Sequence, residues 1–165
     1  MARLGPAGFT RVERDSPLRA RLHPATGGPA LRLVMAREGR VFGGNYALEV
    51  STDTPVLPVT RGLSARGRGV VQTRGVTFRA RRGDRPGAEL AAKLGSDGRL
   101  AERLSRVHFE RIRIEPDGRP VIRHLGGSVV WILFPPIVRK IPFVPAQVQA
   151  TLAALEAFGS ALESD

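Results

Sequence analysis

Hydrophobic residues recur at every second position in two early stretches of the chain. Leu31, Leu33 and Met35 form the first stretch, and Tyr46–Val50 repeats the same spacing. A period of two is typical of a strand with one buried face. Because Gly43-Gly44-Asn45 lies between the two stretches, the pattern predicts an antiparallel pair of strands with a bulged or long connection.

A second pair of strands is predicted at Val70–Thr73 and Val76–Arg81, on either side of a glycine-containing turn. Alternation within the second stretch places Phe78 on the buried face and places Arg79 and Arg81 on the solvent-exposed face. Part of the arginine-rich region is therefore expected on a sheet, where its charges have fixed positions.

Helical spacing follows in three places. Asp84 is expected to cap a first short helix, and Ser96 or Asp97 is expected to cap a second helix directly after it. Pro145 is expected to begin a third helix over residues 145–162, because the apolar residues of this stretch fall on one helical face. Before that helix, Pro116-Asp117-Gly118 separates two alternating runs and predicts a hairpin turn, since each residue type suits its turn position.

The most apolar run of the chain is Val129–Phe134, which contains the only tryptophan, Trp131. If this run is a strand, both of its faces must be covered. It is either a central strand with the terminal helix across it, an interface or lipid-facing surface, or the wall of an apolar ligand cavity. We favour the first interpretation, because continuous apolar strands are usually buried. In the second interpretation, Trp131 and Phe134 are the anchors, and Arg139 and Lys140 contact an acidic partner or lipid headgroups.

These elements predict an α+β fold with a twisted antiparallel sheet of about six to eight strands and two or three helices packed on one face. The length of 165 residues suits a single core, which we place in one domain over residues 31–163. Residues 1–30 form a poorly patterned N-terminal segment. Pro142 cannot donate to a strand ladder, so a strand at Ile137–Phe143 is expected at a sheet edge.

The distribution of charge indicates a candidate binding surface. The chain carries +11 at pH 7, and residues 61–85 hold eight arginines against one acid, Asp84. Such asymmetry attracts phosphates, acidic proteins or anionic lipid. The candidate anion-binding residues are Arg66, Arg68, Arg79, Arg81 and Arg82. The alternative is that arginine, alanine, glycine and proline are abundant because the genome is rich in G and C, without selection for binding.

Acid–base chemistry has one weak candidate pair, Glu110 and His124. If the hairpin loop has three residues, Ile112 lies opposite Ile122 and Glu110 lies opposite His124. A carboxylate opposite an imidazole raises the pKa of the histidine and could serve as an acid–base pair. An ordinary cross-strand pair explains the same residues more simply, and a shift of one residue would separate them.

Other kinds of site are disfavoured. The chain has no cysteine, so disulfides and thiolate metal sites are excluded, and its three histidines lack the spacing of a metal motif. Gly67-x-Gly69 lacks the third glycine of a dinucleotide-binding loop, so no cofactor is expected. The longest nearly uncharged apolar stretch, Ser128–Val138, is shorter than the roughly 20 residues of a spanning helix. With no apolar signal peptide at its start, the chain is expected to be cytoplasmic.

Several sequence features in the C-terminal half resemble one bacterial protein family. They are Leu104 to Phe109 (LSRVHF), Leu125 to Val130 (LGGSVV), Pro135-Pro136, Arg139-Lys140-Ile141, and a terminal helix with Gln147 and Gln149. The family is uncharacterised and catalogued as a domain of unknown function, and the resemblance covers roughly residues 40–160. It implies no activity and no catalytic residue, and the first forty residues match least well.

The sequence thus favours a non-enzymatic binding module, with a basic sheet face for an anionic partner and an apolar segment for a homodimer or partner contact. The alternative is nucleic-acid binding through the Arg61–Arg85 cluster. This alternative lacks a clear stacking platform, because Tyr46 and Phe78 fall on the expected core faces. An enzyme that uses Glu110 and His124 is the third hypothesis.

Overall fold

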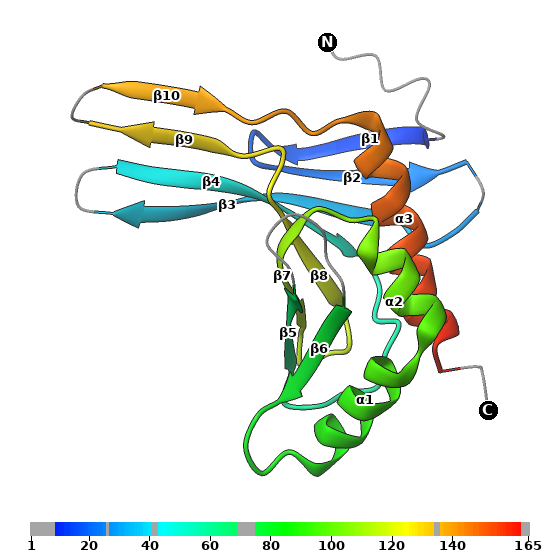
Figure 1. Cartoon of the computed structure of the whole chain (residues 1–165). Coiled ribbons are helices and arrows are strands. Elements are labelled where there is room, and N and C mark those ends of the chain that lie inside the picture. The colour runs from blue at the N-terminus through cyan, green and yellow to red at the C-terminus, as the bar shows by residue number, and fades with distance from the viewer. Residues whose placement is uncertain (1–8, 26, 41–42, 69–74, 134–135, 163–165) are drawn as a thin grey trace.

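The computed structural model describes residues 9–25, 27–40, 43–68, 75–133 and 136–162. Within these residues the chain forms ten strands and three helices (Figure 1). Their bounds are β1 (Phe9–Ser16), β2 (Arg19–Pro24), β3 (Leu31–Arg40), β4 (Gly43–Thr52), β5 (Leu63–Arg68), β6 (Gly75–Ala80), α1 (Arg85–Ser96), α2 (Gly98–Ser105), β7 (Phe109–Ile114), β8 (Pro120–His124), β9 (Val129–Ile132), β10 (Ile137–Lys140) and α3 (Pro145–Ser160).

The strands form one antiparallel sheet that forks at β4. The main path has the order β1-β2-β3-β4-β8-β7-β5-β6. The second half of β4 pairs with β8 through Glu49–Ser51, whereas its first half pairs with β9 through Gly43–Tyr46, and β10 lies outside β9. In Figure 1 the hairpins β3–β4 and β9–β10 project together away from the three helices. The predicted α+β fold is confirmed, with a ten-stranded sheet.

The helices begin where the sequence predicts. Asp84 caps α1 by accepting a hydrogen bond from the Gly87 backbone N–H at 3.1 Å. Asp97 caps α2 in the same way, through the Leu100 N–H at 2.8 Å. Short polar side chains at these positions satisfy amide groups that have no partner inside the helix. α3 begins at Pro145, as expected, without a side-chain cap. None of the helices in the described ranges is long and apolar enough to cross a membrane.

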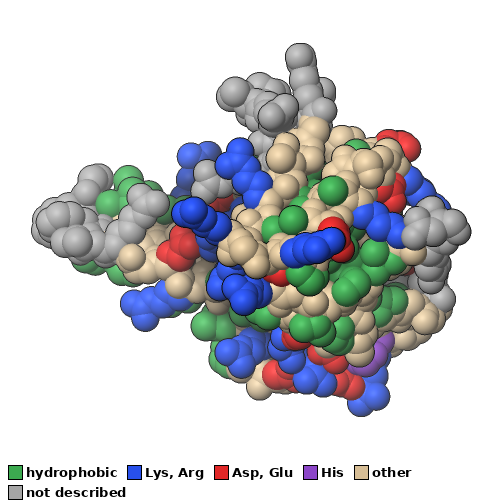
Figure 2. Space-filling model, turned by 90° about the horizontal axis from the view of Figure 1, so that it is seen from below, with side chains coloured by type: hydrophobic (Ala, Val, Ile, Leu, Met, Phe, Trp, Pro, Cys, Tyr) green, Lys and Arg blue, Asp and Glu red, His purple; other side chains and the backbone are tan. Residues whose placement is uncertain are grey.

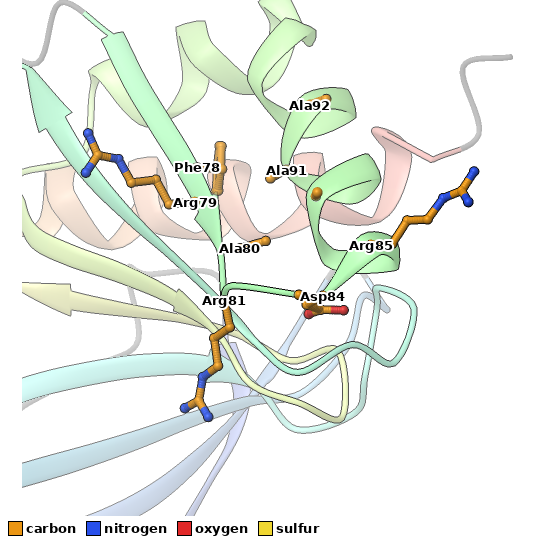
Figure 3. Close-up of a pocket in the computed structure, with 10 residues that line it drawn as sticks. Phe78, Arg79, Ala80, Arg81, Asp84, Arg85, Ala91 and Ala92 are labelled. Atoms are coloured by element: carbon orange, nitrogen blue, oxygen red, sulfur yellow. The ribbon is translucent and has the colours of Figure 1, made fainter.

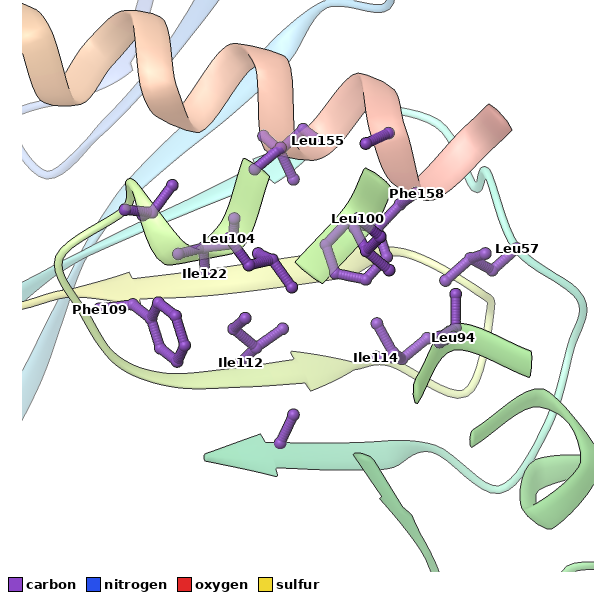
Figure 4. Packing of buried hydrophobic residues seen from close by; sticks show 14 of the residues in the cluster. Leu57, Leu94, Leu100, Leu104, Phe109, Ile112, Ile114, Ile122, Leu155 and Phe158 are labelled. Atoms are coloured by element: carbon purple, nitrogen blue, oxygen red, sulfur yellow. The ribbon is translucent and has the colours of Figure 1, made fainter. Parts of the chain in front are cut away.

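The core lies between the helices and one face of the sheet around β7 and β8 (Figure 4). Ile112 on β7 and Ile122 on β8 point toward Leu104 of α2 and Phe158 of α3, and all four side chains are fully buried. α3 packs against α2, β4 and β8. Alternation along the strands therefore sends apolar residues to the helices and charged residues to the opposite face.

The favoured interpretation of Val129–Phe134 is only partly right, because the strand lies between β4 and β10 but the terminal helix makes no principal contact with it. The segment forms β9 beside the projecting end of β4, its side chains are half-buried or exposed, and α3 packs elsewhere. The physical reason is a difference in length: β4 has ten residues and β8 has five, so part of β4 extends beyond the helices and β9 pairs there. Phe134 lies outside the described residues.

Two further predictions concern neighbouring strands. Val70–Thr73 lies outside the described residues, and the partner of β6 is β5 instead. The strand predicted near Pro142 is β10, which pairs only with β9 among the described strands and is therefore an edge, as expected. β1 and β2 add two strands from the segment that showed little pattern.

Candidate binding groove beside the edge strand

The predicted pairing of Glu110 with His124 is wrong. The hairpin turn forms as expected, with the Glu115 N–H donating to the Arg119 carbonyl at 2.9 Å, and Ile112 lies opposite Ile122. An irregularity between Phe109 and Arg111 then inserts one residue, so Phe109 takes the position opposite His124. Glu110 instead lies 2.8 Å from the Arg123 Nε.

His124 is enclosed beneath α3 and has no exposed nitrogen with which to catalyse a reaction. Its Nε2 lies 3.3 Å from the Thr151 hydroxyl, which itself donates to the Gln147 carbonyl at 2.6 Å. Its ring packs edge-on against Phe143 at a centroid distance of 4.7 Å. Burial lowers the pKa of His124 to about 4, so the imidazole is uncharged at neutral pH. These contacts give His124 a packing role.

Carboxylates pair with the arginines at the centre of the helix-free sheet face. Arg123, whose side chain is only 2% exposed, contacts Glu38 and Glu110, and the bond to Glu38 raises the pKa of the guanidinium. Arg113 pairs with Glu49 at 3.1 Å. Paired charges have little free attraction for an outside anion, so Arg113 and Arg123 are poorly suited to bind one.

The arginines on β6 and just after it have a different environment. Arg79, Arg81 and Arg82 are exposed and form no ion pair with any other described residue. Arg79 lies opposite Ser64 on β5, so its nearest cross-strand neighbour carries no charge. Arg66 and Arg68 belong to β5, and their side chains lie outside the described parts of the chain.

A groove of about 720 Å³ lies between β6 and α1 (Figure 3). Phe78 and Ala80 line it from the strand, and Ala88, Ala91 and Ala92 line it from the helix. Arg79 and Arg81 border the same groove, and their side chains point away from α1 (Figure 3). Seen from this end of the molecule, Figure 2 shows hydrophobic side chains at the surface with Lys and Arg side chains beside them.

Asp84 also lines the groove, but backbone donors already occupy its carboxylate. One oxygen accepts from the Gly87 N–H and the other accepts from the Arg61 N–H at 2.8 Å. The carboxylate is nearly buried and belongs to the start of α1. It therefore leaves Arg79 and Arg81 without a neutralising partner inside the groove.

A second hollow of about 180 Å³ lies on the other side of the same two arginines. Arg61, Arg79, Arg81 and Arg113 line it, together with Glu115, whose carboxylate lies 3.6 Å from the Arg113 Nε. Arg79 and Arg81 thus border both depressions.

The groove follows an edge of the sheet. The main strand path ends at β6, which has a hydrogen-bonded strand neighbour on one side only among the described strands. Every second residue of such a strand presents its N–H and C=O outward. A strand edge with no described strand partner, an adjacent helix and unpaired arginines therefore occur together at this site.

Sequence reasoning found part of this site. Alternation identified Arg79 and Arg81 as exposed and Phe78 as buried, and Phe78 contacts Phe158 edge-on at a centroid distance of 6.1 Å. The alanines of α1 were missed, because the sequence pattern of a helix does not say which strand it will lie along. Their small size, at positions 88, 91 and 92 on one side of the helix, was the available signal.

The described residues contain no cluster of three or more His, Asp or Glu side chains that could hold a metal ion. No curated protein and no solved structure matches the chain. In agreement with the resemblance seen in its sequence, the chain belongs to the family described as "Protein of unknown function (DUF3156)", whose family model matches residues 2–162.

Proposed function

We propose that this protein is a binding module that holds an extended acidic segment of a partner protein in the groove between β6 and α1. The observation that carries the proposal is the combination of an unpaired strand edge with two unpaired arginines at a groove of about 720 Å³. Extended peptides bind in this manner when they add a strand to an exposed sheet edge.

The backbone of the partner supplies affinity in this proposal. β6 is six residues long, so a segment of similar length could pair with its outer edge. Side chains of an added strand alternate between two directions. One set would lie against Phe78 and the alanines of α1, and the other set would point toward Arg79 and Arg81.

The unpaired guanidiniums supply selectivity for acidic side chains. Arg79 and Arg81 need no rearrangement to accept a carboxylate, because neither has to leave an existing ion pair. Arginine binds carboxylates through two parallel hydrogen bonds, which adds geometric selection to the attraction between charges. The small hollow with Arg61 offers a further basic position for an acidic side chain.

Nucleic acid is a weaker candidate ligand for the same arginines. Binding of single strands relies on exposed aromatic rings that stack with bases. Phe78, the aromatic residue of the groove, is buried and packs against Phe158. Phosphates could still be attracted to Arg79 and Arg81, and the experiment below includes this outcome.

The test is fluorescence anisotropy with a labelled peptide of about ten residues that alternates valine and glutamate. The double variant Arg79→Glu/Arg81→Glu should weaken binding by more than about tenfold, because each lost charge-assisted hydrogen bond contributes about 1.5–3 kcal/mol. The control is Arg14→Glu/Arg99→Glu, which makes the same change in net charge at two exposed arginines outside the groove.

Equal weakening by the two double variants would show a nonspecific charge effect and would contradict the proposal. A second peptide carries N-methyl groups at every backbone amide and cannot donate to β6. If it bound as tightly as the first peptide, addition of a strand would be excluded. A preference for single-stranded DNA over both peptides would favour the nucleic-acid alternative.

A further inference from the structure

The β9–β10 hairpin exposes large apolar side chains near its tip. Leu133 is 51% exposed, Ile137 is 46% exposed and Val138 is 69% exposed. Ile132 is exposed as well, and no helix packs against the hairpin among the principal element contacts. Contiguous exposed apolar residues of this kind mark a surface that is covered by something else.

The apolar residues lie on both faces of the hairpin. Ile137 pairs with Ile132, and the next position along, Val138, pairs with Trp131. Successive residues of a strand point to opposite faces, so one apolar pair lies on each face. A flat protein surface would cover one face and leave the other in water. An environment that surrounds the tip would cover both.

Basic residues follow the apolar tip in order along the hairpin. Arg139 pairs with Val130 and Lys140 pairs with Val129, one and two positions farther from the tip than Val138. Both side chains are exposed. At roughly 3.4 Å per residue, the charges lie about 3–7 Å behind the last apolar pair. The depth to which apolar groups enter a membrane interface, about 5–10 Å, is similar.

We propose that Ile132, Leu133, Ile137 and Val138 of the β9–β10 hairpin insert into the interface of an anionic lipid bilayer. The apolar residues Ile132, Leu133, Ile137 and Val138 enter the acyl boundary, while Arg139 and Lys140 contact the lipid phosphates. Trp131 lies opposite Val138, in the last apolar pair before the basic residues, where an amphipathic indole ring is stabilised. The net charge of +11 supports attraction to a negatively charged surface.

A homodimer through β10 fits these observations less well. The strand has four residues, and pairing it with a second copy would cover the edge while leaving both apolar faces exposed. Each copy carries +11, so two copies also repel one another. The inference is independent of the groove beside β6, because β6 ends the main strand path whereas β9 and β10 branch from it at β4.

Trp131 provides a direct readout, because it is the only tryptophan of the chain. The experiment adds vesicles of phosphatidylcholine with about one-third phosphatidylglycerol to the full-length protein and records tryptophan emission and co-sedimentation. We expect a blue shift, quenching by brominated acyl chains, and weaker binding to vesicles of phosphatidylcholine alone. Absence of binding to the anionic vesicles would overturn the proposal.

Variants separate insertion from simple charge attraction. Ile137→Ser/Val138→Ser should lower the partition coefficient by more than about tenfold, and Arg139→Gln/Lys140→Gln should lower it by a similar factor on anionic vesicles only. The control Val59→Ser removes a side chain that is 76% exposed on a loop elsewhere, and should bind like the wild type. Circular dichroism verifies that each variant is folded.

Three results would contradict insertion. The first is an equal loss of vesicle binding in Val59→Ser and Ile137→Ser/Val138→Ser. The second is vesicle binding without quenching of tryptophan emission by brominated acyl chains. The third is a stable dimer in sedimentation analysis that Ile137→Ser/Val138→Ser abolishes while vesicle binding persists.

Discussion

The indole of Trp131 on β9 lies directly over Gly44 on β4. A β-carbon at Gly44 would come within 2.7 Å of the Trp131 Nε1 and within 2.8 Å of two ring carbons. The two residues pair across the strands, and no helix in the described part of the chain makes a principal contact with β9. An aromatic ring over a strand glycine packs against backbone that a side chain would otherwise cover. This contact adds to the β4–β9 pairing that joins the β9–β10 hairpin to the rest of the sheet.

The variant Gly44→Ala should therefore destabilise the protein by about 1–3 kcal/mol, since the new methyl group displaces the ring. Gly39 provides a matched control: it lies opposite Gly44 on β3, and a β-carbon there would meet nothing within 4 Å. Urea denaturation, followed by circular dichroism, measures both variants. Equal stability of Gly39→Ala and Gly44→Ala would contradict the contact.

Stability should depend on pH through His124. Its pKa falls from the usual 6.5 to about 4 in the folded protein, so the unfolded chain binds more protons between these values. The free energy of unfolding should consequently rise as the pH increases from about 4 to 6.5, by up to about 3 kcal/mol.

The variant His124→Leu removes the titrating group and should flatten this dependence. Urea denaturation across this pH range measures the slope. An unchanged slope in His124→Leu would show that other groups cause the pH dependence.

Asp84 and Asp97 each cap a helix, but Asp84 also accepts a hydrogen bond from the Arg61 N–H. Replacing either aspartate with alanine removes a helix cap and should cost about 1 kcal/mol. Asp84→Ala also leaves the Arg61 N–H without its acceptor, which adds about 1 kcal/mol or more. Chemical denaturation should therefore rank Asp84→Ala as the less stable variant, and the reverse order would contradict this account of the site.

Removing the two charged partners of Arg123 should destabilise the protein more than replacing Arg123 itself. Arg123→Met exchanges the buried guanidinium for an apolar chain, and its partners Glu38 and Glu110 are exposed enough to be hydrated. The double variant Glu38→Gln/Glu110→Gln keeps the guanidinium buried while removing its charged partners. We expect the double variant to be less stable than Arg123→Met by about 1–3 kcal/mol in urea denaturation. A more stable double variant would show that solvent reaches Arg123.

Local sequence rules predicted the features that depend on a few neighbouring residues. The turn at residues 116–118 formed as expected, because proline, aspartate and glycine determine its backbone angles by themselves. The bulge at Glu110 was not predictable, since it depends on the fit between β7 and β8. One inserted residue was enough to replace the proposed Glu110–His124 pair with a contact to Arg123.

The position of β9 required information about distant strands. An apolar run of residues looks the same in sequence whether helices or other surroundings cover it. The difference in length between β4 and β8 decides that β9 extends beyond the helices. Similarly, alternation placed Arg79 on the exposed face, but only the register with Ser64 explains why it has no charged neighbour across the strand. Cytoplasmic location and a homodimer stay predictions from the sequence.

The central claim is that an extended acidic segment pairs with β6, and amide hydrogen exchange tests it most directly. Exchange is measured in the full-length protein with and without a saturating amount of the alternating valine–glutamate peptide. Pairing should slow exchange in Gly75–Ala80 and in the adjoining part of α1, because outward amides of an edge strand gain acceptors. Unchanged exchange in Gly75–Ala80 while the peptide is bound would contradict the claim.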